Sequence, residues 1–514
     1  MERPEEVHPI GTRLKHGLVL SASTYGGALL GFFTQALVFH KIGIGTELDA
    51  YYAASALPAA VTMTLTNAGR NLLIPLFSRL ASDAFGLGRL LSALLVWSLG
   101  IGSVLAVLLH VFRTSVVGIL VPGFAPETVE KTVHLFSWFL LTVPVSITVN
   151  ALQCLLISRE LFSVHSRALL IQPLVILFSA AGLLESLGVM ALVAGNVTAL
   201  IAQGIYVAHQ ARHRCSVRFR LCMFHSSLNS LLHDCLPIIT STFANRSTLL
   251  LEKVFSSYLG PGAVTVIELG RKLSGVAGQA VTNMNIVAFP ELSRSGQSKD
   301  FARLGEIARE NQRTTFVGFL LLLVAFLAIA EPFVSLITGD NFQQSTFSAT
   351  ATVPILAAYF LVSCGAALAG TMTYCFYACG TTKPVAFAVV TSMIIMGFSG
   401  WLLTPVFGVY GLAVSALLQH LFVFVFLVMR SKRAFSFKLA GRDIVSTYVR
   451  PTAVALITIV LSFAVRAGVI RVFEPPQHVV GWLFPGVVLT CLLLVLRVLP
   501  LAEVKLLLRR IRDR

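Results

Sequence analysis

Long apolar runs separated by short polar segments recur along the whole chain. Each run has about 20 residues, the length that an α-helix needs to cross the hydrocarbon core of a bilayer. The pattern predicts an all-α polytopic membrane protein with about 14 transmembrane helices. The expected spans cover residues 17–42, 50–77, 90–112, 132–157, 163–184, 187–209, 232–258, 264–290, 314–337, 352–378, 384–404, 407–429, 447–468 and 479–499.

Composition and charge support this interpretation. The chain is 56% hydrophobic and only 12% charged, with a mean hydropathy of +0.82, whereas soluble proteins carry about 25% charged residues. If both termini are cytoplasmic, most of the 39 Lys and Arg residues fall in cytoplasmic loops and tails, as the positive-inside rule requires. The net charge of +16 therefore indicates orientation and contact with anionic lipid headgroups, and no nucleic-acid partner is expected.

A pattern of about forty residues occurs twice, about 215 positions apart. Each copy opens with a Gly-rich turn and continues as an apolar helix that carries Asn and Arg. Each ends in Pro-x-x-Ser-Arg, at residues 75–79 and again at residues 290–294. Internal repeats with polar residues at matching depth are typical of transporters whose two lobes surround a central pathway.

The longest hydrophilic segment that divides the spans evenly lies at 212–230 and follows the sixth span. The predicted division is an N-terminal lobe at 1–210, a basic cytoplasmic linker at 211–231, a C-terminal lobe at 232–430, and two extra helices with a basic tail at 431–514. Six spans per lobe would make the repeats parallel, related by an axis along the membrane normal. The chain has no nucleotide-binding glycine loop, so transport is expected to depend on gradients, membrane potential or a partner.

Ionisable side chains within spans are costly, about 2.5–3.5 kcal/mol on insertion scales, so they usually face a cavity or a partner. The candidate substrate-binding residues combine a surplus of cations with hydrogen-bonding groups. They are Arg271, Arg246, Lys272, Lys253, Glu268, Asn283 and Asn150. A cationic surplus suits a phosphate or pyrophosphate group, and arginine can contact it with two parallel hydrogen bonds.

Alternatives remain for each of these residues. Glu268 lies three residues before Arg271 and four before Lys272, so it could pair with either along a helix. Either cation could instead extend to the outer interface. Arg246 could pair with a neighbouring helix, and the asparagines could bind sugar hydroxyls or bridge helices.

A second set of polar residues is expected to act in gating or structure: Asp49, Arg70, Asn67 and Glu252. Asp49 opens the second span and is expected to cap that helix, because carboxylates favour helix N-termini. Arg70 could line a cavity or form a hydrogen bond at a cytoplasmic gate. No Ser-His-Asp or paired-carboxylate arrangement is evident, so no enzymatic activity is expected.

Two segments carry a resemblance to a known family. The string Gly43-x-Gly45-x-x-x-Asp49-Ala-Tyr-Tyr52 resembles the start of the second helix in the MurJ/MviN lipid II flippases. The segments Glu268-Leu-Gly-Arg271 and Phe289-Pro-x-Leu-Ser-Arg294 resemble the eighth helix of that family. These proteins belong to the multidrug/oligosaccharidyl-lipid/polysaccharide (MOP) exporter superfamily, and the resemblance covers most of the chain.

The resemblance implies two six-helix lobes related by a pseudo-two-fold, a V-shaped central cavity with alternating access, and two C-terminal helices that form a groove for a polyprenyl tail. It also implies that Asp49 and Arg271 keep family positions. The family's other cavity arginines fall on Ala28, Thr34 and Thr62 in this sequence. This departure makes a lipid-linked glycan other than lipid II a contender.

The resulting hypothesis is a flippase, and not an enzyme, that moves an undecaprenyl-pyrophosphate-linked saccharide across the bacterial inner membrane. The substrate would be lipid II-like, or alternatively an exopolysaccharide or O-antigen repeat unit. The protein is expected to be a multi-pass monomer with both termini cytoplasmic. Its expected partners are the lipid-linked oligosaccharide and the bilayer, and contact with glycan-synthesis enzymes stays open.

No cofactor is expected, while Na⁺, H⁺ or the membrane potential could drive transport. A MATE-type drug or cation antiporter is a further alternative, although such a protein needs an acidic lobe and this chain has few membrane carboxylates. A non-transporting scaffold in a glycan-synthesis complex is the third.

Overall fold

The computed structural model describes residues 10–79, 84–215, 227–338, 346–435, 448, 449 and 452. All regular structure in this part of the chain is helical, which confirms the all-α fold class. The Cα positions group into two compact units. Unit 1 comprises Met1–Thr265 and Ile337–Thr346, and unit 2 comprises Val266–Leu336 and Phe347–Arg514.

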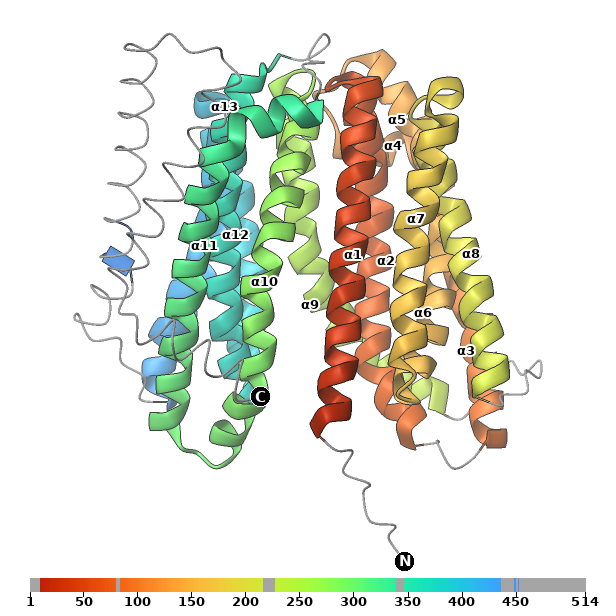
Figure 1. Ribbon diagram of the computed structural model, residues 1–514, viewed down its shortest axis with the longest axis vertical. Coiled ribbons are helices and arrows are strands. Elements are labelled where there is room, and N and C mark those ends of the chain that lie inside the picture. Colours follow the sequence, from red (N-terminus) through yellow and green to blue (C-terminus); the bar gives the residue numbers. More distant parts are fainter. Residues whose placement is uncertain are drawn as a thin grey trace, which may run out of the picture. The chain divides into compact units, whose positions relative to one another are not determined.

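Unit 1 is a bundle of long helices with shorter ones at one end (Figure 1). Helix α7 packs against both α1 and α8, and α6 packs on both α2 and α3. The helices of this unit are α1 Ile10–Ile42, α2 Thr46–Arg79, α3 Ala84–Val111, α4 Arg113–Leu120, α5 Pro126–Phe139, α6 Thr142–Ser158, α7 Phe162–Leu187, α8 Met190–Arg214, α9 Ser227–Ser256 and the 3₁₀ turn η1 Ser257–Leu259.

Unit 2 contains most of α10 Ala263–Gln297, together with α11 Phe301–Thr338, α12 Ala349–Ala378 and α13 Lys383–Phe435. The long α13 bends at Gly408, where φ is 58° and the backbone is not helical. A glycine tolerates this left-handed conformation because it has no Cβ. The bend separates the two spans expected at 384–404 and 407–429.

Most expected spans coincide with observed helices. The span expected at 132–157 is interrupted at Leu140 and Leu141, between α5 and α6, although Pro126–Ser158 still reads as one apolar run. The short α4 was not expected. The last two expected spans, at 447–468 and 479–499, lie outside the described residues except for positions 448, 449 and 452.

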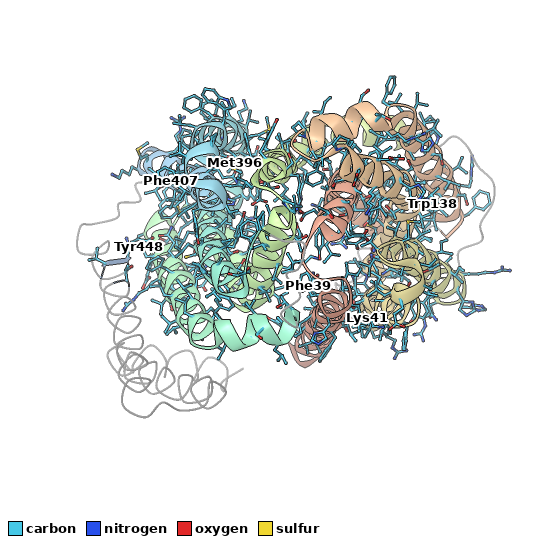
Figure 2. The ribbon with its side chains drawn as sticks, turned by 90° about the horizontal axis from the view of Figure 1, so that it is seen from above. Phe39, Lys41, Trp138, Met396, Phe407 and Tyr448 are labelled. Atoms are coloured by element: carbon cyan, nitrogen blue, oxygen red, sulfur yellow. The ribbon has the colours of Figure 1, made fainter. Side chains whose placement is uncertain are left out.

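Six described helical segments are long and apolar enough to cross a membrane: Phe85–Val111, Pro126–Ser158, Phe162–Leu187, Met190–Arg214, Ala351–Ala378 and Lys383–Lys432. Helices α2, α9 and α10 are 34, 30 and 35 residues long. These three helices carry most of the polar residues singled out in the sequence. Exposed aromatic rings such as Trp138 and Phe407 lie on the outside of their own units (Figure 2).

The two copies of the repeat form helices of nearly equal length, α2 and α10. Both Pro-x-x-Ser-Arg motifs lie at the C-terminal ends of these helices, with Arg79 closing α2 and Arg294 in the last turn of α10. The sequence repeat therefore corresponds to two helices of similar length and ending. The bounds of the two units differ from those of the predicted lobes, because α9 groups with unit 1 and the division falls within α10. The lobe boundary at 211–231 stays a prediction.

Each unit has its own packed core. In unit 1, Phe77, Leu91 and Leu155 come from three different helices and are fully buried. In unit 2, Leu292, Phe376 and Leu427 play the same part. Lipid tails are as apolar as these side chains, so close van der Waals packing, rather than exclusion from water, stabilises such helix contacts.

Two ion pairs join helix ends in unit 1. Lys41 at the end of α1 contacts Glu185 of α7 at 2.7 Å, and Lys131 of α5 contacts Glu47 of α2 at 2.8 Å. Figure 2 labels Lys41 at this end of the bundle. The side chains are partly or largely exposed, so solvent screening makes each pair contribute little to stability.

Gly102 allows α3 and α6 to approach closely, because a Cβ at this position would lie 2.6 Å from Cα of Pro144. Gly102→Ala should therefore force the helices apart and lower the free energy of unfolding by about 1–3 kcal/mol. Thermal unfolding of the detergent-solubilised protein would measure this loss. Gly100→Ala is the matched control, since no atom lies within 4 Å of its Cβ position. Equal unfolding temperatures for the two variants would contradict the packing argument.

Candidate functional site

A buried carboxylate joins two segments of unit 1 that are far apart in the sequence. Asp49 of α2 is 1% exposed. Its Oδ2 accepts a hydrogen bond of 2.6 Å from the backbone N–H of Gly262, and its Oδ1 accepts bonds of 2.8 and 2.6 Å from the N–H and hydroxyl of Thr265. Gly262 directly precedes α10 and Thr265 lies in its first turn, where backbone N–H groups have no partner within their own helix. Asp49 therefore caps the N-terminus of α10.

The expectation that Asp49 caps its own helix is wrong. Helix α2 begins at Thr46, so Asp49 already lies within its first turn, with its own N–H donating to Gly45 O at 3.1 Å. The carboxylate is directed to a different helix start more than 200 residues away. Three donors on one carboxylate fit its ionised form, and the positive end of the α10 dipole favours that charge.

Two further charged residues are buried behind this cap. Lys253 and Glu252 of α9 are 2% and 3% exposed. Lys253 Nζ lies 6.0 Å from the ring centroid of Tyr52, and its charge interacts with Asp49. Gln35 of α1 in turn donates a hydrogen bond to the Tyr52 hydroxyl. A substrate contact from Lys253, which stays a prediction, would require this packing to open.

The turn between η1 and α10 is held at two more points. The N–H of Gly123 donates to Ser257 Oγ at 3.0 Å, and the N–H of Thr346 donates to Pro261 O at 3.0 Å. A Cβ on Gly123 would lie 2.7 Å from the backbone of Ser257. Together with the Asp49 cap, these contacts tie residues 257–265 to three separate parts of unit 1.

Unit 2 contains the pair that the sequence proposed as its main anion site. Arg271 Nη2 lies 3.3 Å from Glu268 Oε2 on α10, with side chains 25% and 17% exposed. This contact is the first of the two pairings that the sequence left open, between residues three apart on the helix. Lys272 is exposed. One turn further, Ser274 and Ser363 share a hydrogen bond of 2.7 Å between α10 and α12.

The remaining candidates are dispersed. Arg246 is half-buried on α9 and so belongs to unit 1, not to the unit of Arg271. Asn150 donates from Nδ2 to the carbonyl of Thr66 at 3.2 Å, which joins α6 to α2. Arg70 is exposed and Asn67 is half-buried. The side chain of Asn283 lies outside the described residues.

Sequence reasoning missed Gly262, Thr265 and Ser257 as partners in this site. The Gly-rich turn before α10 was a visible signal of a helix start, but nothing in it identified a carboxylate from α2. Among the residues that the structure describes, no three His, Cys, Asp or Glu side chains gather closely enough to hold a metal ion.

Solved structures with this fold are membrane transporters. The lipid II flippase MurJ in an inward closed conformation matches with a TM-score of 0.77 and 14% identity, over 95% of this chain and 100% of that chain. An inward-facing MATE-family multidrug resistance transporter of the MOP superfamily matches with a TM-score of 0.65 and 13% identity, over 80% and 96% of the two chains. A MOP superfamily transporter from Pyrococcus furiosus matches with a TM-score of 0.60 and 13% identity, over 82% and 96%. No curated protein matches the sequence.

The chain therefore shares the α-helical fold of these solved transporters. Within this class, the family model for the lipid II flippase MurJ matches residues 38–489. The chain belongs to the lipid II flippase MurJ family, which groups it with transporters and not with enzymes.

Asp49→Ala should release the first turn of α10, because the N–H groups of Gly262 and Thr265 lose their acceptor. Hydrogen–deuterium exchange of the peptide that covers residues 260–266 should then accelerate about tenfold or more, as expected for the loss of charge-assisted hydrogen bonds. Glu47→Gln is the matched control, since it removes a carboxylate of α2 that pairs with Lys131 and not with the start of α10. Unchanged exchange in Asp49→Ala would show that the cap does not hold this turn in solution.

Proposed function

We propose that this protein is a flippase that moves an undecaprenyl-pyrophosphate-linked saccharide across the bacterial cytoplasmic membrane. Membership of the lipid II flippase family supports the substrate class. The observation that carries the chemistry is Arg271, a partly exposed arginine on α10 whose guanidinium lies 3.3 Å from the carboxylate of Glu268. An arginine can bind a phosphate with two parallel hydrogen bonds and keeps its charge at any cellular pH.

In this proposal the pyrophosphate binds Arg271, with help from Arg246 or Lys272, and the glycan occupies polar surface while the polyprenyl tail stays in lipid. Glu268 holds the guanidinium in place before the substrate arrives. The distance of 3.3 Å is longer than the usual 2.7–2.9 Å of a strong charged hydrogen bond. An incoming diphosphate, with more negative charge, can therefore compete for Arg271.

Access to the site alternates between the two sides of the membrane. The Asp49 cap is suited to act as a gate. Its three hydrogen bonds hold the start of α10 to α2, and they are lost when the start of α10 moves away. Breaking the cap leaves a carboxylate and two backbone N–H groups in need of water or new partners. The closed and open conformations of the cap then differ by these three hydrogen bonds.

The proposal includes a multi-pass monomer with both termini cytoplasmic and no organic cofactor. The chain has no nucleotide-binding loop, so a Na⁺ or H⁺ gradient or the membrane potential would supply the driving force. Contact with glycan-synthesis enzymes would deliver the substrate.

Arg271→Gln should abolish transport, because the neutral amide cannot balance a diphosphate. The measurement is flipping of a fluorescent undecaprenyl-pyrophosphate disaccharide in proteoliposomes, followed by quenching from outside. Arg271→Lys should retain part of the rate, since it keeps the charge but loses the two-point contact. Lys299→Gln, in the exposed turn between α10 and α11, controls for loss of a surface cation. Full activity of Arg271→Gln would refute this assignment.

The lipid that co-purifies with the full-length protein should carry a pyrophosphate and a saccharide. Mass spectrometry of the extracted lipids would identify it. A peptide-bearing disaccharide would favour a peptidoglycan precursor, and a peptide-free repeat unit would favour an exopolysaccharide or O-antigen precursor. A preparation that enriches no pyrophosphate lipid but transports cationic dyes in exchange for Na⁺ or H⁺ would replace the proposal with a MATE-type antiporter.

A further inference from the structure

Arg70 differs from Arg271 in its contacts with other side chains. It is exposed on α2, nine residues before that helix ends at Arg79. Within the described part of the chain, no hydrogen bond or ion pair reaches its side chain. Arg271, by contrast, contacts Glu268. A guanidinium on a membrane helix without a counter-charge has a high free energy. Binding of an anion by Arg70 would lower that free energy.

Asn67 adds a hydrogen-bond donor on the same face of α2. Residues three apart on a helix are neighbours, so the Asn67 amide lies one turn from Arg70. Its side chain is half-buried and has no hydrogen-bond partner among the described residues. A carboxamide beside a guanidinium can donate to the same anionic group.

His165 supplies an independent observation. It lies in the first turn of α7 and is 5% exposed, and the structure gives its Nδ1 no hydrogen-bond partner within the described residues. Arg70 is close enough to interact electrostatically with this ring. Leaving a buried polar atom unsatisfied costs about 1–3 kcal/mol. The adjacent Ser166, 1% exposed, also has a hydroxyl without a partner in this part of the chain.

We propose that Arg70, Asn67 and His165 form a binding site for a phosphate-type anion on unit 1. The guanidinium would bind two oxygens, the amide of Asn67 a third, and the N–H of a neutral imidazole could donate to an inward-facing oxygen. All three residues belong to unit 1, whereas Arg271 belongs to unit 2. The inference rests on the proposed function and adds a second headgroup site to it, near the end of α2 opposite Asp49.

The same chemistry could recognise a lipid-linked diphosphate, a phospholipid headgroup or a free phosphate. Native mass spectrometry of the full-length protein in detergent can separate these sources. The probes are undecaprenyl pyrophosphate, undecaprenol as the phosphate-free lipid, phosphatidylglycerol and inorganic pyrophosphate. Each is titrated against the unmodified chain and the variants Arg70→Gln, Arg70→Lys, His165→Asn and Arg271→Gln.

Arg70→Gln should weaken undecaprenyl pyrophosphate binding about tenfold, which corresponds to the loss of one charged hydrogen-bond contact. Arg70→Lys should lose less, and His165→Asn should show a smaller loss in the same direction. Arg89→Gln is the control, because Arg89 is another exposed arginine of unit 1 and lies over the ring of Phe85. Undecaprenol binding should be the same in all variants.

The outcomes separate this site from the proposed function. Selective loss of undecaprenyl pyrophosphate supports a substrate headgroup site, and parallel loss of phosphatidylglycerol or inorganic pyrophosphate supports the same anion site with a less selective occupant. If Arg271→Gln weakens binding while both Arg70 variants and His165→Asn do not, the second site is refuted and the proposed function stands. If none of the four variants weakens binding, both are refuted. If Arg70→Gln does not fold, Arg70→Lys and His165→Asn decide.

Discussion

The contact on which the rest of the structure depends is the buried carboxylate of Asp49 at the start of α10. A charge that is 1% exposed is tolerated only if hydrogen bonds and opposite charge replace water. The first turn of α10 supplies the donors, and Lys253 supplies a nearby positive charge. In return, the helix start gains an acceptor that its own sequence does not provide. The start of the second repeat helix is thereby fixed by a residue of the first.

This constraint organises the neighbouring polar groups. Lys253 lies against Tyr52, which Gln35 holds in turn, so α1, α2 and α9 contribute to one buried network. Ser257 and Pro261 bind the adjoining loops. The polar residues of α2, α9 and α10 thus divide into two kinds. Asp49 and Lys253 are buried and interact with other groups of unit 1, whereas Arg70 and Arg271 keep exposed surface.

Several features followed from the sequence because their causes are local. Apolar runs of membrane length predicted the long helices up to α13, although not the short α4 or the break between α5 and α6. The repeat predicted that α2 and α10 would match in length and ending. The spacing of the charges on α10 allowed Glu268 to pair with Arg271 or Lys272, since residues three or four apart on a helix are neighbours, and the structure contains the contact with Arg271. The string around Asp49 and the segment around Arg271 predicted the family that the comparison with known proteins then showed.

By itself, the sequence determined the all-α membrane class, the helix lengths and the surplus of positive charge, because hydrophobicity and helix geometry act over neighbouring residues. Only the tertiary structure decided which buried polar groups meet. Asp49 and Gly262 are 213 positions apart, and no local pattern specifies a partner at that distance. The grouping of α9 with unit 1 and the burial of Lys253 have the same origin, since both depend on which helices pack together and not on the residues within any one of them.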